Sequence, residues 1–263
     1  MKLSPVLKIT TAAMLMCLAI IFTQLIVLDI PPFIRIGIGA LPVIFASVIL
    51  GPIYGGVVGA LADVLGFFLF DRSGYPYTPF VTISGIILGV LPYFVFLVTK
   101  KLRYQKKPWP LSYLLMISIW TFLLVYVLTA GQVTLRLDAN TMVTYVFDIY
   151  WKVLTPIVTA VVFGLFTLFI HFSNRYFQKR ILDLANCPSP HEVAFLVLLL
   201  EILVNIIWGS VWKSVFFHAD FMVILFLQGL ILVLAFPVKT FILNYLFMIY
   251  YRYVDKARSN KVD

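Results

Sequence analysis

Asp63 has the most unusual chemistry for its surroundings in this sequence, because it interrupts a continuous apolar run. A carboxylate in the middle of a bilayer costs at least ~2.5 kcal/mol to insert, so it requires a partner or a function. Two interpretations stay open. Asp63 could contact a ligand or an ion in a cavity at membrane depth, or it could be a hydrogen-bonded acid that only stabilises helix packing.

Arg35 and Tyr77 lie in the connections on either side of that run. Arg35 follows a Pro-Pro pair, where its guanidinium could receive an anionic ligand or could simply extend to the membrane interface. Tyr77 belongs to the stretch 71–79, which contains tyrosine, glycine and proline. Such a loop could cover a ligand or form an ordinary aromatic belt at the interface.

A second polar group is expected in the last third of the chain. Asn205 and Trp208 are three residues apart, which places them on one face of an α-helix. An amide and an indole there could bind a heteroaromatic ring by hydrogen bonding and stacking, and a hydrogen bond between helices explains them equally well. Glu201 is expected to have a structural partner inside the bundle, whereas Lys239 is expected to extend toward the cytoplasmic interface.

Signatures of several enzyme and nucleotide-binding classes are absent from the sequence. It contains no G-x-x-x-x-G-K-[ST] loop, no H-E-x-x-H and no G-x-S-x-G. Its three histidines are scattered, and Cys17 and Cys187 form no motif. We therefore predict no catalytic residues, no metal site and no cofactor, and a membrane-embedded enzyme is disfavoured.

The composition predicts that these residues lie in a membrane protein. Of 263 residues, 62% are hydrophobic and 12% are charged, and the mean hydropathy is +1.04. A bilayer core of ~30 Å is crossed by about 20 helical residues. The apolar runs predict an all-α, polytopic bundle of eight transmembrane helices, at about 8–28, 36–50, 53–70, 80–99, 111–134, 142–172, 193–216 and 221–250.

The net charge of +9 follows the topology of such a bundle. Lys and Arg cluster at the N-terminus, in 100–107, in 175–180 and in the C-terminal tail, while the alternate connections hold about one basic residue each. This distribution predicts that both termini are cytoplasmic. It also accounts for the basic charge without nucleic-acid binding.

Small residues form a ridge on the third expected helix. Gly55, Gly59 and Gly66 lie along one of its sides, and Gly85 and Gly89 repeat the four-residue spacing on the next helix. Such spacing lets helix backbones approach closely inside a bilayer. Asp63 lies on the flank of the ridge, so we expect it to face protein rather than lipid.

The stretch R-I-G-I-G-A-L-P-V-I-F-A-S-V-I-L-G-P-I-Y-G-G-V-V-G-A-L-A-D-V-L-G-F-F-L-F, residues 35–70, resembles a known family. It is similar to the substrate-binding S components of energy-coupling-factor vitamin transporters, and most similar to the folate type. The residues that carry the resemblance are Arg35-Ile36, Pro42, Gly51-Pro52, Gly55-Gly56, Gly59-Ala60, Asp63, Gly66, Pro79 and Ser84-Gly85. Asn205-Ile206-Ile207-Trp208, with Pro237, resembles the last two helices of the family.

The resemblance implies a bacterial plasma-membrane protein that captures a vitamin-like small molecule, folate or a related pterin first. It implies docking on a transmembrane coupling subunit that is driven by two cytoplasmic ATPase subunits. The pocket would open outward beneath residues 29–35 and 71–79. The implied ligand-binding residues are Arg35, Asp63, Tyr77, Asn205 and Trp208, and those implied at the coupling subunit are Ala12, Ala13 and Cys17.

Two departures from the family affect this prediction. Family members have six helices, so we treat 1–263 as one transmembrane domain in which 1–107 and 191–263 form the core and 108–190 is an inserted helix pair. The last helix also lacks the Arg and Lys that the family carries before its proline, with Gln228 the only strongly polar residue there. Alternatives therefore remain: an S component for a different small molecule, or an enzyme or scaffold that binds partners through the inserted helices.

Overall fold

The computed structural model describes residues 4–30, 34–70, 76–103, 111–129, 132–138, 141–146, 149–181, 187–218 and 220–259. The elements in chain order are α1 (Pro5–Gln24), β1 (Val27–Ile30), β2 (Ile34–Gly37), α2 (Ala40–Leu50), α3 (Pro52–Phe70), α4 (Pro79–Arg103), α5 (Leu111–Thr129), β3 (Gln132–Asp138), β4 (Thr141–Val146), α6 (Ile149–Ile181), α7 (Pro190–Leu200), η1 (Glu201–Trp208), α8 (Gly209–Phe217) and α9 (Phe221–Ser259).

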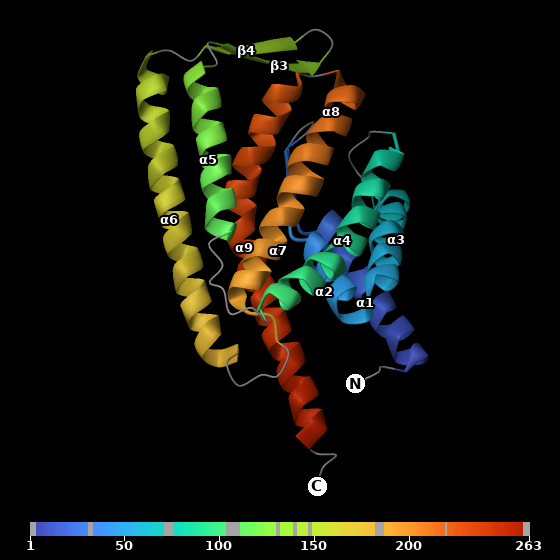
Figure 1. Ribbon diagram of the computed structural model, residues 1–263. Coiled ribbons are helices and arrows are strands. Elements are labelled where there is room, and N and C mark those ends of the chain that lie inside the picture. The colour runs from blue at the N-terminus through green and yellow to red at the C-terminus, as the bar shows by residue number, and fades with distance from the viewer. Residues whose placement is uncertain are drawn as a thin grey trace.

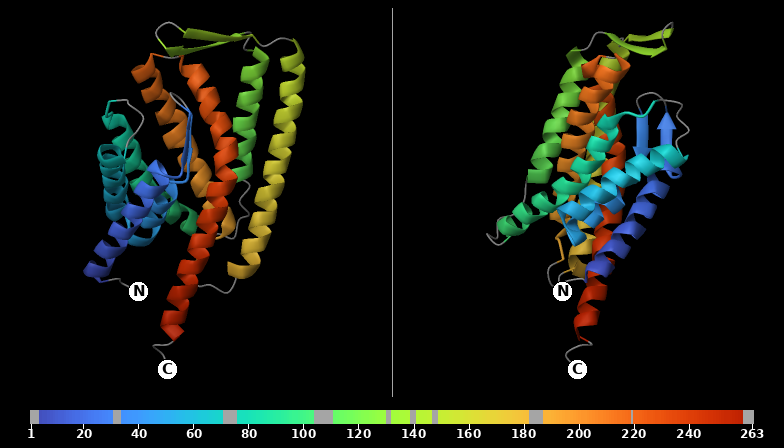
Figure 2. Two further views of the ribbon diagram at one scale, coloured as in Figure 1. Left: turned by 180° about the vertical axis from the view of Figure 1, so that it is seen from behind. Right: turned by 90° about the vertical axis from the view of Figure 1, so that its right-hand side faces the viewer.

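The helices form two groups that meet along α7 and α9. Helices α1 to α4 pack together on one side, while α5 and α6 lie at the opposite edge, as Figures 1 and 2 show. Helices α5 and α6 contact α7 and α9, and the first group meets the same pair through α4 and α2. Both termini lie at one end of the bundle, and the β3–β4 hairpin lies at the other (Figure 1).

Local sequence explains where several helices begin. Proline is the first residue of α1, α3, α4 and α7, a position where its missing N–H is not needed. Ser4 caps α1 by accepting a hydrogen bond from the Leu7 N–H at 3.3 Å. Ser189 and Glu192 form a reciprocal capping box at the start of α7. These caps satisfy amide groups that would otherwise have no partner at the helix ends.

Two β-hairpins correct the expected helix boundaries. The helix expected at 8–28 ends earlier than predicted, and the helix expected at 36–50 begins later. The reason is that β1 and β2 lie between them and pair antiparallel, with Asp29 opposite Arg35. The strands β3 and β4, which are also antiparallel, replace the expected end of the helix at 111–134 and the expected beginning of the helix at 142–172. Polar and apolar residues alternate along Gln132–Asp138, which is the period of a strand and not of a helix.

Four helical stretches in the described part of the chain are long and apolar enough to cross a membrane. They are Pro5–Gln24, Pro52–Phe70, Pro79–Lys101 and Pro190–Phe217. A fifth would be α9, whose halves Phe221–Val233 and Ala235–Val254 are bent by 44°. Pro237, which cannot donate a backbone hydrogen bond, explains the bend. The count of eight spans and the cytoplasmic termini remain predictions.

The expected glycine contact joins α3 to α4. A methyl group built at Gly55 would collide with the Gly89 carbonyl oxygen, and one at Gly59 would collide with the Gly85 carbonyl oxygen. Close packing of the ridge is therefore confirmed for these four glycines. Gly66 approaches a side chain instead, since its added Cβ would lie 3.0 Å from Nε2 of Gln24.

Replacing Gly55 by alanine tests this backbone contact. The added methyl group would also lie 2.7 Å from Cα of Ser47 in α2, so three helices would have to shift. We expect the variant to lose about 1–3 kcal/mol of stability, the usual effect of overpacking. Gly164→Ala is the matched control, because a methyl group there meets no atom within 4 Å. Equal melting temperatures of the two purified variants would contradict the contact.

Candidate functional site

A cavity of about 360 Å³ lies between helices α1 to α4 on one side and η1, α8 and α9 on the other. Its lining comes from α1 to α4, from η1 and α8, and from α9, and Val27 of β1 and Gly37 of β2 contribute to it. Helix α8 lies in the half of the bundle away from both termini (Figure 1). The cavity therefore lies on the side that the charge distribution predicts to be outside the cell.

One wall of the cavity holds a chain of three hydrogen-bonding groups. The Thr82 hydroxyl donates to Oδ2 of Asp63 at 2.5 Å, and the Tyr77 hydroxyl lies 2.5 Å from the same Thr82 oxygen. Because the single Thr82 hydrogen is used by Asp63, Tyr77 is the donor to Thr82. The Tyr77 ring packs against Phe67 and Phe68, at centroid distances of 5.3 and 5.6 Å.

This wall brings together two of the predicted site residues. Asp63 and Tyr77 both line the cavity, so Asp63 faces protein as expected. Thr82, which joins them, was not among the predicted site residues. Its signal was weak, because a threonine in the first turn of a helix is common.

A buried ion pair lies on the facing wall. Lys239 Nζ is 2.6 Å from Oε1 of Glu201, and both side chains are at most 7% exposed. The Asn205 amide donates to the other carboxylate oxygen, Oε2, at 2.7 Å. All three residues line the cavity. The expected structural partner of Glu201 is thus confirmed, whereas the expectation that Lys239 extends to the interface is wrong.

The tryptophan that lines the cavity is Trp212 and not Trp208. Glu201–Trp208 is a π-helical segment, in which the Gly209 N–H bonds to the Val204 carbonyl five residues earlier. The wider turn changes which residues share a face, so the α-helical spacing of Asn205 and Trp208 no longer applies. The Trp208 indole N–H donates to the Phe80 carbonyl at 3.3 Å instead.

Other cavity-lining groups on α8 are aromatic or basic. Trp212 packs near Phe216 with a centroid distance of 6.4 Å, and Lys213 lies 5.7 Å from the Trp212 ring. Phe216 and Lys213 both line the cavity. The site therefore combines flat apolar surfaces with hydrogen-bonding groups on two walls, which suits binding of a polar ring system.

The remaining predicted residues are placed only in part. Arg35 belongs to β2, and its side chain lies outside the described part of the structure, as do residues 71–75. On α1, Ala13 and Cys17 are exposed on one side of the helix. Ala12 is half-buried and packs against the small core formed with α2 and α3.

Replacing Lys239 by methionine tests the buried ion pair. Glu201 would keep a buried charge without its cation, so we expect the variant to lose about 3 kcal/mol of stability. Adding Glu201→Gln removes both charges at nearly constant volume, and the double variant should regain most of that loss. Melting temperatures of the single and double variants form a double-mutant cycle. Losses that simply add would show that the two residues are not coupled.

Comparisons with known proteins agree with the resemblance seen in the sequence. Residues 7–172 match the family described as "ECF transporter, substrate-specific component". The folate transporter FolT of Clostridium novyi (strain NT) is 36% identical over 94 residues, which are 36% of this chain and 52% of that protein. The chain thus spans about half the length of this curated relative. A crystal structure of FolT bound with folic acid is 16% identical, covers 90% of each chain and has a TM-score of 0.49. Because the family match covers more than half of its 263 residues, this chain belongs to the substrate-specific components of ECF transporters.

Proposed function

We propose that this protein captures folate or a related pterin outside the cell for ATP-driven import by other subunits. The observation that carries the proposal is the cavity of about 360 Å³ between α1–α4 and the segments η1, α8 and α9, lined by polar groups on facing walls. Its volume falls in the range of about 300–1,000 Å³ that is usual for small-molecule sites. The similarity to a folate transporter supports folate as the first ligand to test.

The chemistry of the lining fits the pterin ring. Its fused pyrimidine carries amino, N–H and carbonyl groups, and Glu201 and Asn205 offer acceptors and a donor of the matching kind. Trp212 and Phe216 offer rings for stacking. The glutamate tail of folate is anionic, and Lys213 at the cavity and Arg35 in β2 are cations that could receive it.

Two connections, one after α1 and one after α3, would cover the cavity. Residues 29–35 overlap the β1–β2 hairpin, and the neighbouring residues Val27 and Gly37 line the cavity. Residues 76–78 of the second connection line it too. We assign both connections the role of covering the bound ligand.

The exposed side of α1 is the proposed contact to a transmembrane coupling subunit. Ala13 and Cys17 lie four residues apart on that side, and small side chains there permit close approach of a partner helix. Ala12 would support this contact from the half-buried flank. The energy would come from two cytoplasmic ATPases in other chains, since the sequence holds no P-loop.

The eight-helix topology belongs to the same proposal. Helices α5 and α6 contact α7 and α9 at the edge of the bundle, and none of the side chains described on α5 and α6 lines the cavity. This arrangement supports the treatment of 108–190 as a pair inserted into a six-helix core, with both termini in the cytoplasm of a bacterial cell. The family match includes α5 and most of α6, up to residue 172.

A second candidate is a substrate-specific component for another, less charged vitamin. It is favoured by the ion pair, because Lys239 is already neutralised by Glu201. A ligand with a carboxylate would then depend on Lys213, which lines the cavity, and on Arg35 in β2.

A panel of vitamins tested by thermal unfolding of the detergent-purified protein distinguishes these candidates. A ligand at 100 times its Kd stabilises the native state by ~2.7 kcal/mol, so folate should raise the melting temperature clearly. In the Arg35→Ala variant the folate shift should decrease while a pterin without the glutamate tail keeps its effect. A shift with another vitamin only would select the second candidate. No shift with any vitamin would contradict both.

A further inference from the structure

The seam between α6 and α9 has a chemistry that vitamin capture does not use. We define the α6–α9 seam by one phenylalanine, one tyrosine and one arginine from each helix. These are Phe169, Tyr176 and Arg180 of α6, and Phe241, Tyr245 and Arg252 of α9. Phe241 packs against α6, with centroids 6.3 Å from Phe169 and 5.2 Å from Phe177. These ring contacts fix how the two helices face each other.

The aromatic residues of the seam remain open to the surroundings of the bundle. Phe169 and Phe241 are 42% and 40% exposed, and Tyr176 and Tyr245 are 46% and 47% exposed. Phe177, which lies behind them, is fully buried. The seam is therefore an outward-facing aromatic surface with a packed floor, in a protein whose outer surface meets lipid.

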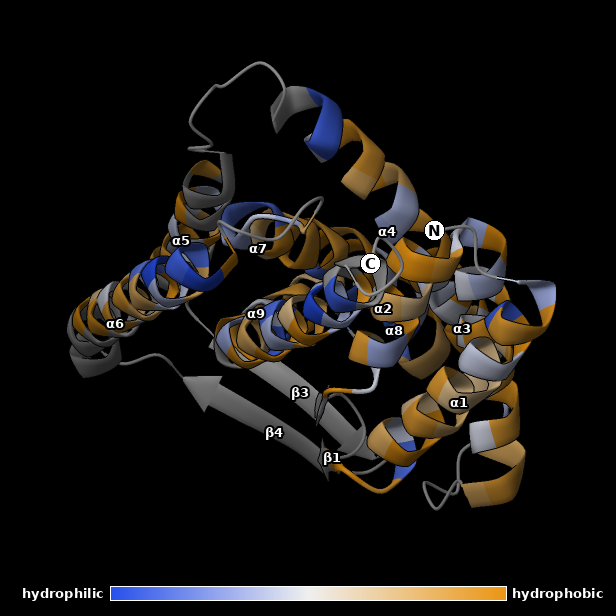
Figure 3. Cartoon of the chain, turned by 90° about the horizontal axis from the view of Figure 1, so that it is seen from below, coloured by the Kyte–Doolittle hydropathy of each residue, from blue (hydrophilic) through white to orange (hydrophobic). Residues whose placement is uncertain are grey.

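Both arginines lie at the same end of this surface. Arg180 comes three residues after Phe177, and Arg252 comes eleven residues after Phe241, so the two guanidinium groups differ in depth by about two turns or less. Both are exposed, and the Arg180 guanidinium lies over the Tyr176 ring at 4.3 Å. Hydrophilic residues gather at this end of α6 and α9 in Figure 3.

Acidic residues do not balance this positive charge within the two helices. Helix α6 contains no Asp or Glu, and α9 contains only Asp255. Helix α6 has 33 residues, a length of ~50 Å, so it extends beyond a hydrocarbon core of ~30 Å. In the proposed eight-helix topology, its basic end lies at the layer of lipid headgroups on the cytoplasmic side.

We propose that the α6–α9 seam binds an anionic phospholipid. The acyl chain of the lipid would lie along Phe169 and Phe241. Tyr176 and Tyr245 would lie at the level of the lipid glycerol. Arg180 and Arg252 would contact the lipid phosphate. A planar guanidinium suits a phosphate because it donates two parallel hydrogen bonds. Basic sites between transmembrane helices are places where anionic headgroups bind.

Native mass spectrometry of the full-length protein in detergent tests this site, with phosphatidylglycerol and phosphatidylcholine as probes. The unmodified protein should retain phosphatidylglycerol in preference to phosphatidylcholine. Arg180→Gln with Arg252→Gln should reduce that preference by about fivefold for each arginine, which corresponds to about 1 kcal/mol each. Folate binding should not change, because neither arginine lines the cavity.

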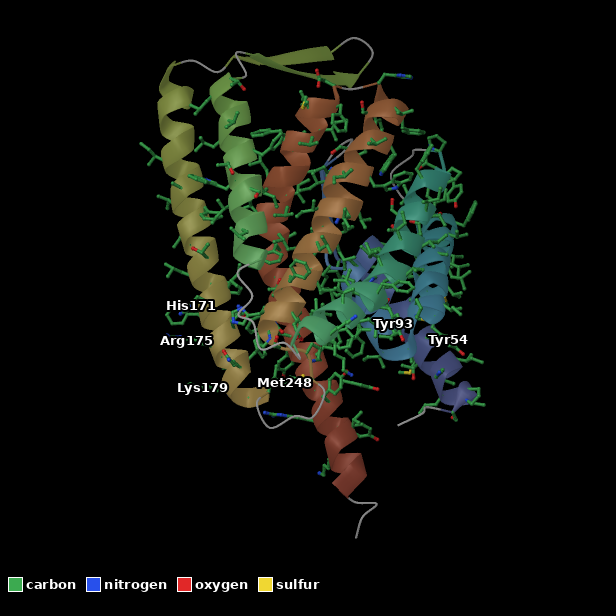
Figure 4. All side chains as sticks on the ribbon, in the orientation of Figure 1. Tyr54, Tyr93, His171, Arg175, Lys179 and Met248 are labelled. Atoms are coloured by element: carbon green, nitrogen blue, oxygen red, sulfur yellow. The ribbon has the colours of Figure 1, made fainter. Side chains whose placement is uncertain are left out.

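Arg175→Gln with Lys100→Gln is the matched control. It also removes two positive charges, from the basic segments 100–107 and 175–180 that are predicted to lie on the same side as the arginines of the seam. Arg175, which Figure 4 labels, lies about 100° around α6 from Tyr176, and Lys100 belongs to α4, outside the seam. This control should keep its lipid preference. An equal loss in both double variants would overturn the proposal, since only diffuse charge would then matter.

Two further outcomes would also overturn the lipid assignment. Inorganic phosphate alone should not raise the melting temperature, and a rise that depends on Arg180 and Arg252 would assign the site to a soluble anion. An unchanged lipid preference together with poorer co-purification of other subunits would assign these arginines to a protein contact.

Discussion

A charged pair inside the bundle constrains the rest of this structure. Lys239 and Glu201 lie in two candidate membrane-spanning stretches, 38 residues apart in sequence, and either one without the other would be a buried charge without its partner. Their contact holds α9 against the π-helical segment at one depth, and Asn205 completes the carboxylate's hydrogen bonds. Because this pair also lines the cavity, the group that stabilises the helix pair is the same group that a ligand would meet.

The opposite side of the cavity is rigid for a different reason. Helices α3 and α4 touch through glycine backbones, which leaves no freedom to rotate Asp63 or the start of α4 away from the cavity. The chain from Tyr77 through Thr82 to Asp63 crosses between these helices and extends to the connection that follows α3. Ligand contacts would therefore form between a wall set by backbone packing and a wall set by an ion pair.

Much of this arrangement could be predicted from the sequence, and the failures have physical causes. Apolar length, four-residue glycine spacing and the insertion cost of Asp63 are local properties, so the bundle and the α3–α4 contact were predictable. The hairpins were missed because short strands beside long apolar helices are read as part of them. The partner of Lys239 depends on a tertiary contact. The fact that Trp212 and not Trp208 lines the cavity depends on the π-helical turn. No local pattern in this single sequence reveals either of them.

Titration calorimetry of folate with two tryptophan variants tests most directly whether the cavity is the binding site. Trp212 lines the cavity, whereas Trp208, one turn earlier, donates to the Phe80 carbonyl. Stacking of a ring on an aromatic side chain contributes about 1–3 kcal/mol, so Trp212→Leu should weaken folate binding about tenfold or more. Trp208→Leu should leave the affinity nearly unchanged. Tight binding by Trp212→Leu together with lost binding by Trp208→Leu would contradict the assignment of this cavity to the vitamin.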